Sequence, residues 1–362
     1  MKKILYDNQM FTLQRFGGVT RYFADLMYNL PQGEFAMEVP MRYCENHYVT
    51  QTYGHEYEKI AFPGNYRLRR QLYMLVNKHI SWKAVKMNDY DIFHPTYFNP
   101  YFLKTVKKRQ KPFVLTVHDM TFERYPQDVL IYDRTIPNKK MLIAEADHII
   151  AVSENTKRDI VELLGTDASK ISVVHHGYRG VGTPAAQLFD RYVLYVGERK
   201  GYKNFLPWLS AIRPIFNLDP NLKVVCTGQP FSSAELKLFT KWSIAERLVH
   251  IAANDAQMAS LYRHALCFVF PSHYEGFGIP ILEAFANGCP VCLSNASCFP
   301  EVAADAAIYF NPNDAQSMQD TLKEVLVSSA LRSELSSKGL ERSKEFCLER
   351  MVSQTCDVYR KL

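Results

Sequence analysis

The chain has 362 residues, of which 47% are hydrophobic and 22% are charged, a composition typical of a globular protein with room for two domains. No run of eighteen apolar residues occurs, so a membrane-spanning helix is not expected, and the early turn to polar residues after Leu5 indicates a first strand and not a secretory signal. The net charge of +6 arises within residues 1–182, which carry 25 basic and 19 acidic residues, whereas residues 183–362 carry 18 of each.

The basic excess is concentrated in segments 67–70, 78–86 and 104–109, with Tyr66, Tyr73 and Trp82 interleaved. Solvated helix faces are one interpretation of these segments. Attraction to an anionic membrane surface, or to an acceptor that carries a diphosphate, is another. Nucleic acid is not expected as a partner, because no nucleic-acid-binding motif accompanies the charge.

The first predicted strand, residues 2–6, is followed by a glycine pair, Gly17 and Gly18, and then by a helix with apolar residues at helical spacing. Such a pair can form a simple tight turn, or it can turn backbone N–H groups toward a phosphate. The pattern G-x-G-x-x-G is absent from this region, which disfavours a dinucleotide-dependent oxidoreductase.

Further predicted strands of the first half cover residues 89–93, 113–117, 148–152 and 171–177. The second of these ends at His118-Asp119, where a side chain can reach into a ligand cleft, and the first ends at His94, for which a structural role is the stronger interpretation. A helix is expected over 138–146, and Ser153 is expected to cap the helix that follows it. Residues 178–190 lack periodicity and are predicted to form a linker.

In the second half, a strand over 192–196 leads into Arg199 and Lys203 just before a predicted helix. Cations between a strand end and a helix N-terminus favour an anion such as a diphosphate. Strands are predicted over 222–227 and 249–251, two helices over 314–344 and a last helix over 348–361. The eight cysteines suit buried thiols in a reducing compartment, and the pair Cys289 and Cys292 is interpreted as structural because no second pair is present for a metal.

The most informative stretch is 266–294, where a buried strand, a glycine-bearing loop, a helix begun by Pro280 and a further strand follow one another. Two carboxylates, Glu275 and Glu283, flank the helix start. Carboxylates there disfavour phosphate but accept hydrogen bonds from sugar or ribose hydroxyls, so the pattern suggests a nucleotide sugar.

The segment Glu275-Gly276-Phe277-Gly278-Ile279-Pro280-Ile281-Leu282-Glu283 resembles the E-x7-E signature of the retaining family 4 glycosyltransferases (glycosyl transferases group 1) of GT-B fold. Cys289-Pro290-Val291 and Phe299-Pro300-Glu301-Val302 are similar to the segments that follow this signature in the family. The resemblance extends to the strand-end His118-Asp119 and to the R-x-x-x-K-N element that holds Arg199 and Lys203, and it spans almost the whole chain.

The resemblance implies two doubly wound, Rossmann-like α/β domains facing across a cleft. Residues 1–180 would bind the acceptor, residues 181–345 would bind the nucleotide-sugar donor, and residues 346–362 would form a C-terminal helix that crosses back to the first domain. Cys347 departs from the family, where many relatives have an aromatic residue, and this bears on packing.

The implied activity is transfer of a hexose-type sugar, with retention, from a nucleoside-diphosphate sugar to a hydroxyl of a glycan or lipid-linked glycan in bacterial polysaccharide or lipopolysaccharide assembly. GDP-mannose, UDP-hexoses and UDP-N-acetylhexosamines stay open as donors. No metal and no other cofactor is expected. The resemblance also implies roles for individual residues. His118 would contact the sugar near its reacting carbon, and Arg199 and Lys203 would neutralise the leaving diphosphate. Glu275 would orient the donor sugar and Glu283 would orient the ribose, and the donor site would be lined by Gly17, Gly18, Gly276, Phe277, Gly278 and Ile279.

We expect a cytoplasmic protein, with peripheral contact at the inner face of the cytoplasmic membrane as an open addition. Two alternatives remain at this point: another GT-B enzyme, such as a sugar-nucleotide epimerase or a phosphorylase, and a non-catalytic protein that binds sugar nucleotides or membranes.

Overall fold

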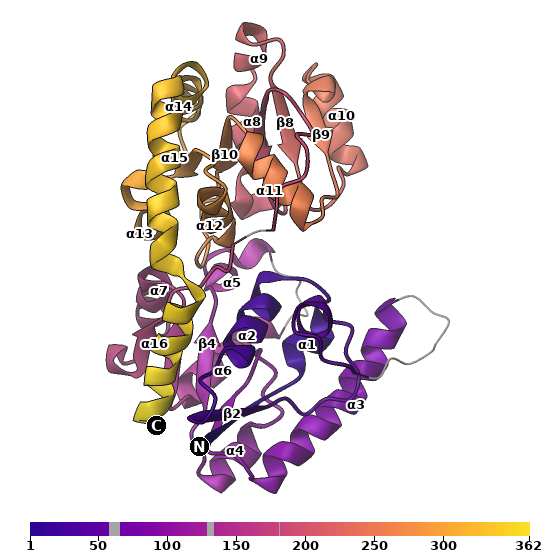
Figure 1. Ribbon diagram of the computed structural model, residues 1–362, viewed down its shortest axis with the longest axis vertical. Helices are drawn as coiled ribbons and strands as arrows, with labels where there is room; N and C mark the ends of the chain where they lie inside the picture. The colour runs from indigo at the N-terminus through magenta and orange to yellow at the C-terminus, as the bar shows by residue number, and fades with distance from the viewer. Residues whose placement is uncertain (58–65, 129–133, 181) are drawn as a thin grey trace. The chain divides into compact units, whose positions relative to one another are not determined.

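The computed structural model describes residues 1–57, 66–128, 134–180 and 182–362 (Figure 1). Residue 181, the first of the predicted donor domain, lies outside them. Contacts divide the chain into two compact units. The N-terminal unit comprises Met1–Arg124, Val129–Gly177 and Leu348–Leu362, and the C-terminal unit comprises Tyr125–Asp128 and Tyr178–Cys347. No helix in the described ranges is both long and apolar enough to cross a membrane.

The N-terminal unit is built on short parallel strands whose residues are all buried or half-buried. They form two groups, in the orders β2-β1-β3 and β4-β5-β6, and a parallel bridge between Phe93 and Phe113 joins β3 to the start of β4. Chain connections leave β1 in opposite directions toward β2 and β3, so ligands are expected at the carboxyl ends of β1 and β3. The strands are β1 (Lys2–Tyr6), β2 (Phe35–Glu38), β3 (Ile92–His94), β4 (Val114–Val117), β5 (His148–Ala151) and β6 (Ile171–Val173).

The helices of this unit include four that the sequence did not predict individually, the short α1, α4 and α5 and the long α3. The predicted cap is confirmed, because the Ser153 hydroxyl accepts a hydrogen bond from the Thr156 backbone N–H at the start of α7. The helices are α1 (Gln9–Leu13), α2 (Gly18–Tyr28), α3 (Tyr66–Met87), α4 (Leu103–Arg109), α5 (Thr121–Arg124), α6 (Thr135–Glu145), α7 (Glu154–Leu164) and α16 (Leu348–Lys361).

The last helix, α16, is part of the core of the N-terminal unit although it follows the whole C-terminal unit in sequence. The Tyr359 hydroxyl lies 2.8 Å from the Tyr6 hydroxyl and 2.6 Å from His94 Nδ1, and His94 Nε2 lies 2.9 Å from the Thr116 hydroxyl. Burial lowers the pKa of His94 to about 3, so its ring is neutral. His94 therefore has a structural role, tying α16 to β1 and β4.

The C-terminal unit contains a six-stranded parallel sheet in the order β12-β11-β10-β7-β8-β9, the doubly wound Rossmann order. Its switch point lies between β7 and β10, where Cys267 pairs with Val193. The strands are β7 (Tyr192–Tyr195), β8 (Lys223–Cys226), β9 (Leu248–His250), β10 (Cys267–Phe270), β11 (Val291–Ser294) and β12 (Ile308–Phe310).

Helices on both faces of this sheet bury its apolar strands, and Cys267 and Cys292 are buried free thiols within it. The helices are α8 (Phe205–Ile212), α9 (Ile215–Leu218), α10 (Ser233–Lys241), α11 (Asp255–His264), α12 (Ile279–Ala286), α13 (Phe299–Ala303), α14 (Ala315–Val327) and α15 (Ser329–Ser343). Each unit thus has the three layers of a Rossmann-like domain, which are helices, a parallel sheet and helices, as predicted for the GT-B fold.

We predict that Tyr359→Phe lowers the stability of the N-terminal unit by about 1–3 kcal/mol, because His94 and Tyr6 each lose a buried hydrogen-bond partner. Tyr90→Phe is the matched control, since the buried Tyr90 hydroxyl has no hydrogen-bond partner among the described residues. Thermal unfolding of the whole chain should show a lower Tm for the first variant only. Equal Tm values for the two variants would contradict the role of the Tyr359 hydroxyl.

Candidate active site

An ion pair occupies the switch point of the C-terminal unit. Lys203 lies on a single 3-10 turn (Gly201–Lys203) that follows β7, and Glu275 lies in the loop that follows β10. The Lys203 ammonium Nζ is 2.6 Å from Glu275 Oε1, and the two side chains are only 15% and 13% exposed. Two residues that are 72 positions apart in the chain therefore meet at the carboxyl edge of the sheet.

Two serines fix the loop that carries Glu275. The Ser272 hydroxyl donates to Glu275 Oε1 at 2.7 Å. Ser297, which follows β11, accepts from the Glu275 N–H at 3.1 Å and donates to the Glu275 carbonyl oxygen at 2.6 Å. The carboxylate is thus held at Oε1 and through the backbone of its residue, so it is oriented before any ligand binds.

The glycine-bearing segment between Glu275 and α12 adopts a conformation that suits glycine. Gly278 has φ +93° as the N-cap of α12, and a Cβ there would lie 3.0 Å from the Ile281 side chain. Pro280 lies in the first helical turn, as predicted. Gly276, Phe277 and Gly278 are buried, and Ile279 is half-buried.

Arg199 forms a second ion pair, with a partner that the sequence analysis did not identify. Its Nε donates to Glu235 Oε1 at 2.6 Å, and its Nη2 donates to the Pro230 carbonyl oxygen at 3.0 Å. Burial acts to raise the pKa of Glu235, but hydrogen bonds from Arg199 and Ser232 outweigh it and hold that pKa below its usual value. The remaining nitrogen, Nη1, is buried without a hydrogen-bond partner in the described part of the chain, so it can still donate to a ligand.

Glu283 lies on α12, and the Tyr262 hydroxyl of α11 donates to its Oε2 at 2.9 Å. Burial raises the pKa of Tyr262 well above its usual value, which keeps the hydroxyl protonated and able to donate. Glu283 is half-buried, and its carboxylate retains acceptor capacity beyond the tyrosine bond.

On one side of this site, the backbone segments that follow β7 and β8 lie in close contact. Gly197 follows β7 with φ +119°, and Gly228 follows β8 with φ +98°. A Cβ on Gly228 would lie 2.7 Å from the Gly197 carbonyl oxygen, which no ordinary contact allows. Glycine at position 228 therefore sets the path of the chain just before Arg199.

His118, Gly17 and Gly18 belong to the N-terminal unit, whereas the other predicted donor-site residues belong to the C-terminal unit. Gly18 is the first residue of α2, and Gly17 is its N-cap. The His118 ring follows β4 and packs against the Tyr22 ring at 5.0 Å and the His176 ring at 5.5 Å. Burial lowers the pKa of His118 to about 4, and neither ring nitrogen has a hydrogen-bond partner among the described residues. The ring is therefore neutral, with a donor and an acceptor available to a ligand.

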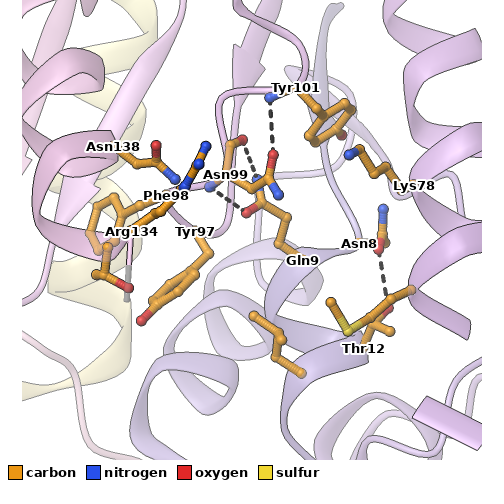
Figure 2. A pocket seen from close by; sticks show the side chains of 13 residues that line it. Asn8, Gln9, Thr12, Lys78, Tyr97, Phe98, Asn99, Tyr101, Arg134 and Asn138 are labelled. Atoms are coloured by element: carbon orange, nitrogen blue, oxygen red, sulfur yellow. Dashed lines mark hydrogen bonds between the residues drawn. The ribbon is translucent and has the colours of Figure 1, made fainter. Parts of the chain in front are cut away.

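A separate pocket of about 200 Å³ opens at the switch point of the N-terminal unit (Figure 2). Its base is rigid: buried Asp7 accepts hydrogen bonds from the Gln9 carboxamide at 2.7 Å and the Thr96 hydroxyl at 2.7 Å, and the Gln9 Oε1 accepts from the Asn99 N–H at 2.8 Å. Carboxamides, aromatic rings and two cations line the pocket, and its lining contains no carboxylate: Asn8, Gln9, Thr12, Leu13, Met74, Lys78, Tyr97, Phe98, Asn99, Tyr101, Arg134, Thr135 and Asn138.

Two family models match this chain and together cover most of it. The model described as "Glycosyltransferase Family 4" matches residues 16–179, and the model described as "Glycosyl transferases group 1" matches residues 184–342. The chain belongs to the family 4 glycosyltransferases. The first match covers the N-terminal unit's glycine pair and His118, and the second covers Arg199, Lys203 and both glutamates of the signature.

Relatives of this glycosyltransferase include mannosyltransferases of bacterial surface polysaccharides. An O-antigen chain mannosyltransferase B of Escherichia coli is 26% identical over 327 residues, which are 84% of this chain and 83% of that protein. An O-antigen chain mannosyltransferase of Salmonella typhimurium is 28% identical over 58% of this chain and 60% of its own length. An Anabaena protein solved in complex with UDP-glucose superposes with a TM-score of 0.75 at 15% identity, covering both chains completely, and this likeness establishes the GT-B fold.

We predict that Gly228→Ala disrupts the candidate site of the C-terminal unit more than the positive φ alone would, because the new Cβ meets the Gly197 carbonyl oxygen. Gly165→Ala is the control, since Gly165 has φ +65° in open space and its replacement adds only about 1–2 kcal/mol of backbone strain. Thermal unfolding and nucleotide titration check both variants. Similar losses of Tm in the two variants would show that the contact between Gly197 and Gly228 does not constrain the site.

Proposed function

We propose that this glycosyltransferase moves a hexosyl group from a nucleoside-diphosphate sugar, bound in the C-terminal unit, to a hydroxyl of a glycan acceptor, bound in the N-terminal unit. The observation that carries the proposal is the ion pair of Lys203 and Glu275 at the switch point. It places a cation that suits a diphosphate beside a carboxylate that suits sugar hydroxyls, where doubly wound sheets bind ligands.

The donor would rearrange this ion pair. A diphosphate oxygen would take the place of the Glu275 carboxylate at Lys203 Nζ, and Glu275 would turn its acceptor oxygens to hydroxyls of the donor sugar. Arg199, held by Glu235, would present Nη1 to the same diphosphate. Glu283 would accept hydrogen bonds from the ribose. Two fixed cations beside the leaving group stabilise the charge that develops on it, so we propose transfer without a metal ion.

The sugar chemistry would proceed with retention at the anomeric carbon. The bond between that carbon and the leaving diphosphate oxygen breaks, the acceptor oxygen attacks from the same face, and its proton passes to the departing phosphate. The neutral His118 ring would donate or accept a hydrogen bond at a sugar hydroxyl near the reacting carbon and would add no charge.

Mannose is the hexose that the relatives favour, since the Escherichia coli and Salmonella typhimurium proteins bear the name of O-antigen chain mannosyltransferases. We therefore propose GDP-mannose as the first donor to test, with UDP-glucose as the second because the Anabaena neighbour was solved with it. A growing surface polysaccharide on a lipid carrier is the acceptor class that these relatives suggest.

The pocket of the N-terminal unit is the proposed acceptor site. Its carboxamides can donate to and accept from sugar hydroxyls, and Tyr97, Phe98 and Tyr101 offer ring faces to a pyranose. Lys78 and Arg134 add positive charge, which suits an acceptor that also carries phosphate. Figure 2 shows these side chains around one opening.

We predict that Lys203→Ala raises the barrier to transfer by about 2–4 kcal/mol, the size of one lost charge-stabilising donor, measured as kcat/KM with each candidate donor. Lys200→Ala is the matched control: Lys200 lies in the same loop, and its partner Glu198 is an exposed neighbour. Turnover that is unchanged by Lys203→Ala would remove Lys203 from the mechanism.

We predict that Glu275→Ala impairs transfer while nucleoside-diphosphate affinity stays near that of the parent chain, because the carboxylate is assigned to the donor sugar. Steady-state kinetics and calorimetric titration of the bare nucleotide separate the two effects. Collapse of nucleotide binding in this variant would reassign Glu275 to the nucleotide.

We predict that Asn138→Ala raises the acceptor KM and leaves donor affinity unchanged, since the Asn138 carboxamide lines the pocket of the N-terminal unit. Lys140→Ala, an exposed change two residues away on the same helix, is the control. One lost hydrogen bond should change the acceptor KM by roughly three- to ten-fold. An acceptor KM equal to that of the Lys140 variant would place the acceptor elsewhere.

A further inference from the structure

The long helix α3 is rich in basic residues, of which Arg69 forms an ion pair with Glu45 from outside the helix. Its 22 residues include six basic residues and no Asp or Glu. Helix α4 adds four basic residues in seven and has no acid of its own, and its Lys107 forms an ion pair with Glu145. The Arg109 guanidinium of α4 donates to the Lys86 carbonyl oxygen of α3 at 3.1 Å, so the two basic segments adjoin. The basic residues are Arg67, Arg69, Arg70, Lys78, Lys83 and Lys86 in α3, and Lys104, Lys107, Lys108 and Arg109 in α4.

One face of α3 also exposes large apolar side chains in a row. Leu68, Leu72, Leu75 and Val76 recur at helical spacing and are 51%, 41%, 69% and 37% exposed. The same face continues toward the C-terminal end of the helix with exposed His79, Lys83 and Lys86. We call this face, from Leu68 to Lys86, the outer face of α3. It is apolar over its first half and cationic over its second.

The opposite face of α3 is firmly anchored, so exposure of the outer face does not come from a loosely packed helix. The Asn77 Oδ1 accepts from the Tyr43 N–H at 3.1 Å, and its Nδ2 donates to the Tyr43 carbonyl oxygen at 2.7 Å. The Tyr73 hydroxyl donates to Glu45 at 2.9 Å, and the Ser81 hydroxyl donates to the Pro40 carbonyl oxygen at 2.9 Å. Figure 1 shows α3 along the outside of the N-terminal unit, with α4 near its C-terminal end.

We propose that the outer face of α3 docks the protein on an anionic lipid surface. Leucine and valine side chains would enter the boundary between headgroups and acyl chains, and the lysines of α3 and α4 would contact lipid phosphates. The charge favours this occupant over a second copy of the chain, because two such faces would bring like charges together. The apolar row disfavours a nucleic acid, whose backbone offers no apolar partner to it.

This docking would bring the proposed acceptor site to the membrane. Met74 and Lys78, on the flank of the same helix, line the pocket of the N-terminal unit. A helix lying in the headgroup layer would therefore place that pocket beside the phosphates of a lipid-linked acceptor. In this respect the inference builds on the proposed function, but the charge and exposure of α3 carry it independently.

Co-sedimentation of the full chain with vesicles tests the proposal. We expect binding to vesicles of phosphatidylcholine mixed with phosphatidylglycerol, little binding to phosphatidylcholine alone, and weaker binding at high salt. The double variant Leu72→Gln/Leu75→Gln should lose about ten-fold or more in partition onto the mixed vesicles, since affinity scales with the buried apolar area. Leu218→Gln/Leu236→Gln, which alters equally exposed leucines of the C-terminal unit, should bind like the parent chain.

Failure of the parent chain to bind anionic vesicles, or equal binding by the two double variants, would overturn the proposal. The mass of both proteins in solution is also measured in the absence of lipid. A smaller mass for Leu72→Gln/Leu75→Gln than for the parent chain would overturn the proposal, because it would show that this face joins two copies of the chain. Hexosyl transfer to a water-soluble acceptor is measured in parallel. It should be unchanged in Leu72→Gln/Leu75→Gln, so loss of membrane binding is distinguished from failure of the proposed enzyme activity.

Discussion

The geometry of the candidate site in the C-terminal unit depends on one electrostatic constraint, which is that Lys203 and Glu275 are largely removed from water and must be paired. Each side chain is less than one-sixth exposed, and an isolated charge at that depth would be costly. The parallel sheet brings them together because β7 and β10 are neighbours at the switch point. A ligand that offers a substitute to both partners would be able to replace this ion pair, and the proposed nucleoside-diphosphate sugar would do so with its phosphates and its hydroxyls.

The same site contains a second cation, Arg199, which is oriented before a ligand binds. Arg199 is oriented by Glu235 and by a backbone carbonyl, and one of its nitrogens is left without a partner among the described residues. A guanidinium fixed in this way loses little side-chain entropy when it binds a phosphate oxygen. The serines around Glu275 and the tyrosine on Glu283 have the equivalent effect on the carboxylates. Orientation before binding is what allows a few polar groups to act selectively on a transition state.

Much of this arrangement could be predicted from the sequence, because local patterns specify it. Buried strands, the Pro280 helix start, the Ser153 cap and the last helix are all encoded within a few neighbouring residues. The contacts that could not be predicted join distant segments. Glu235 meets Arg199 from 36 positions away, Ser297 meets Glu275 from 22, and Tyr359 meets Tyr6 from 353. The short elements α1 and β2 were not predicted, because α1 has five residues and β2 has four, and so few residues show no clear hydrophobic periodicity.

The central claim is that the C-terminal unit binds a nucleoside-diphosphate sugar through its own cations. Calorimetric titration of the full chain with GDP-mannose, UDP-glucose and ADP-glucose, in the presence of EDTA, tests this claim most directly. We expect saturable binding of one donor in preference to the other two, with no need for a divalent metal. Absence of binding with every donor, or binding that appears only after a metal is added, would contradict it.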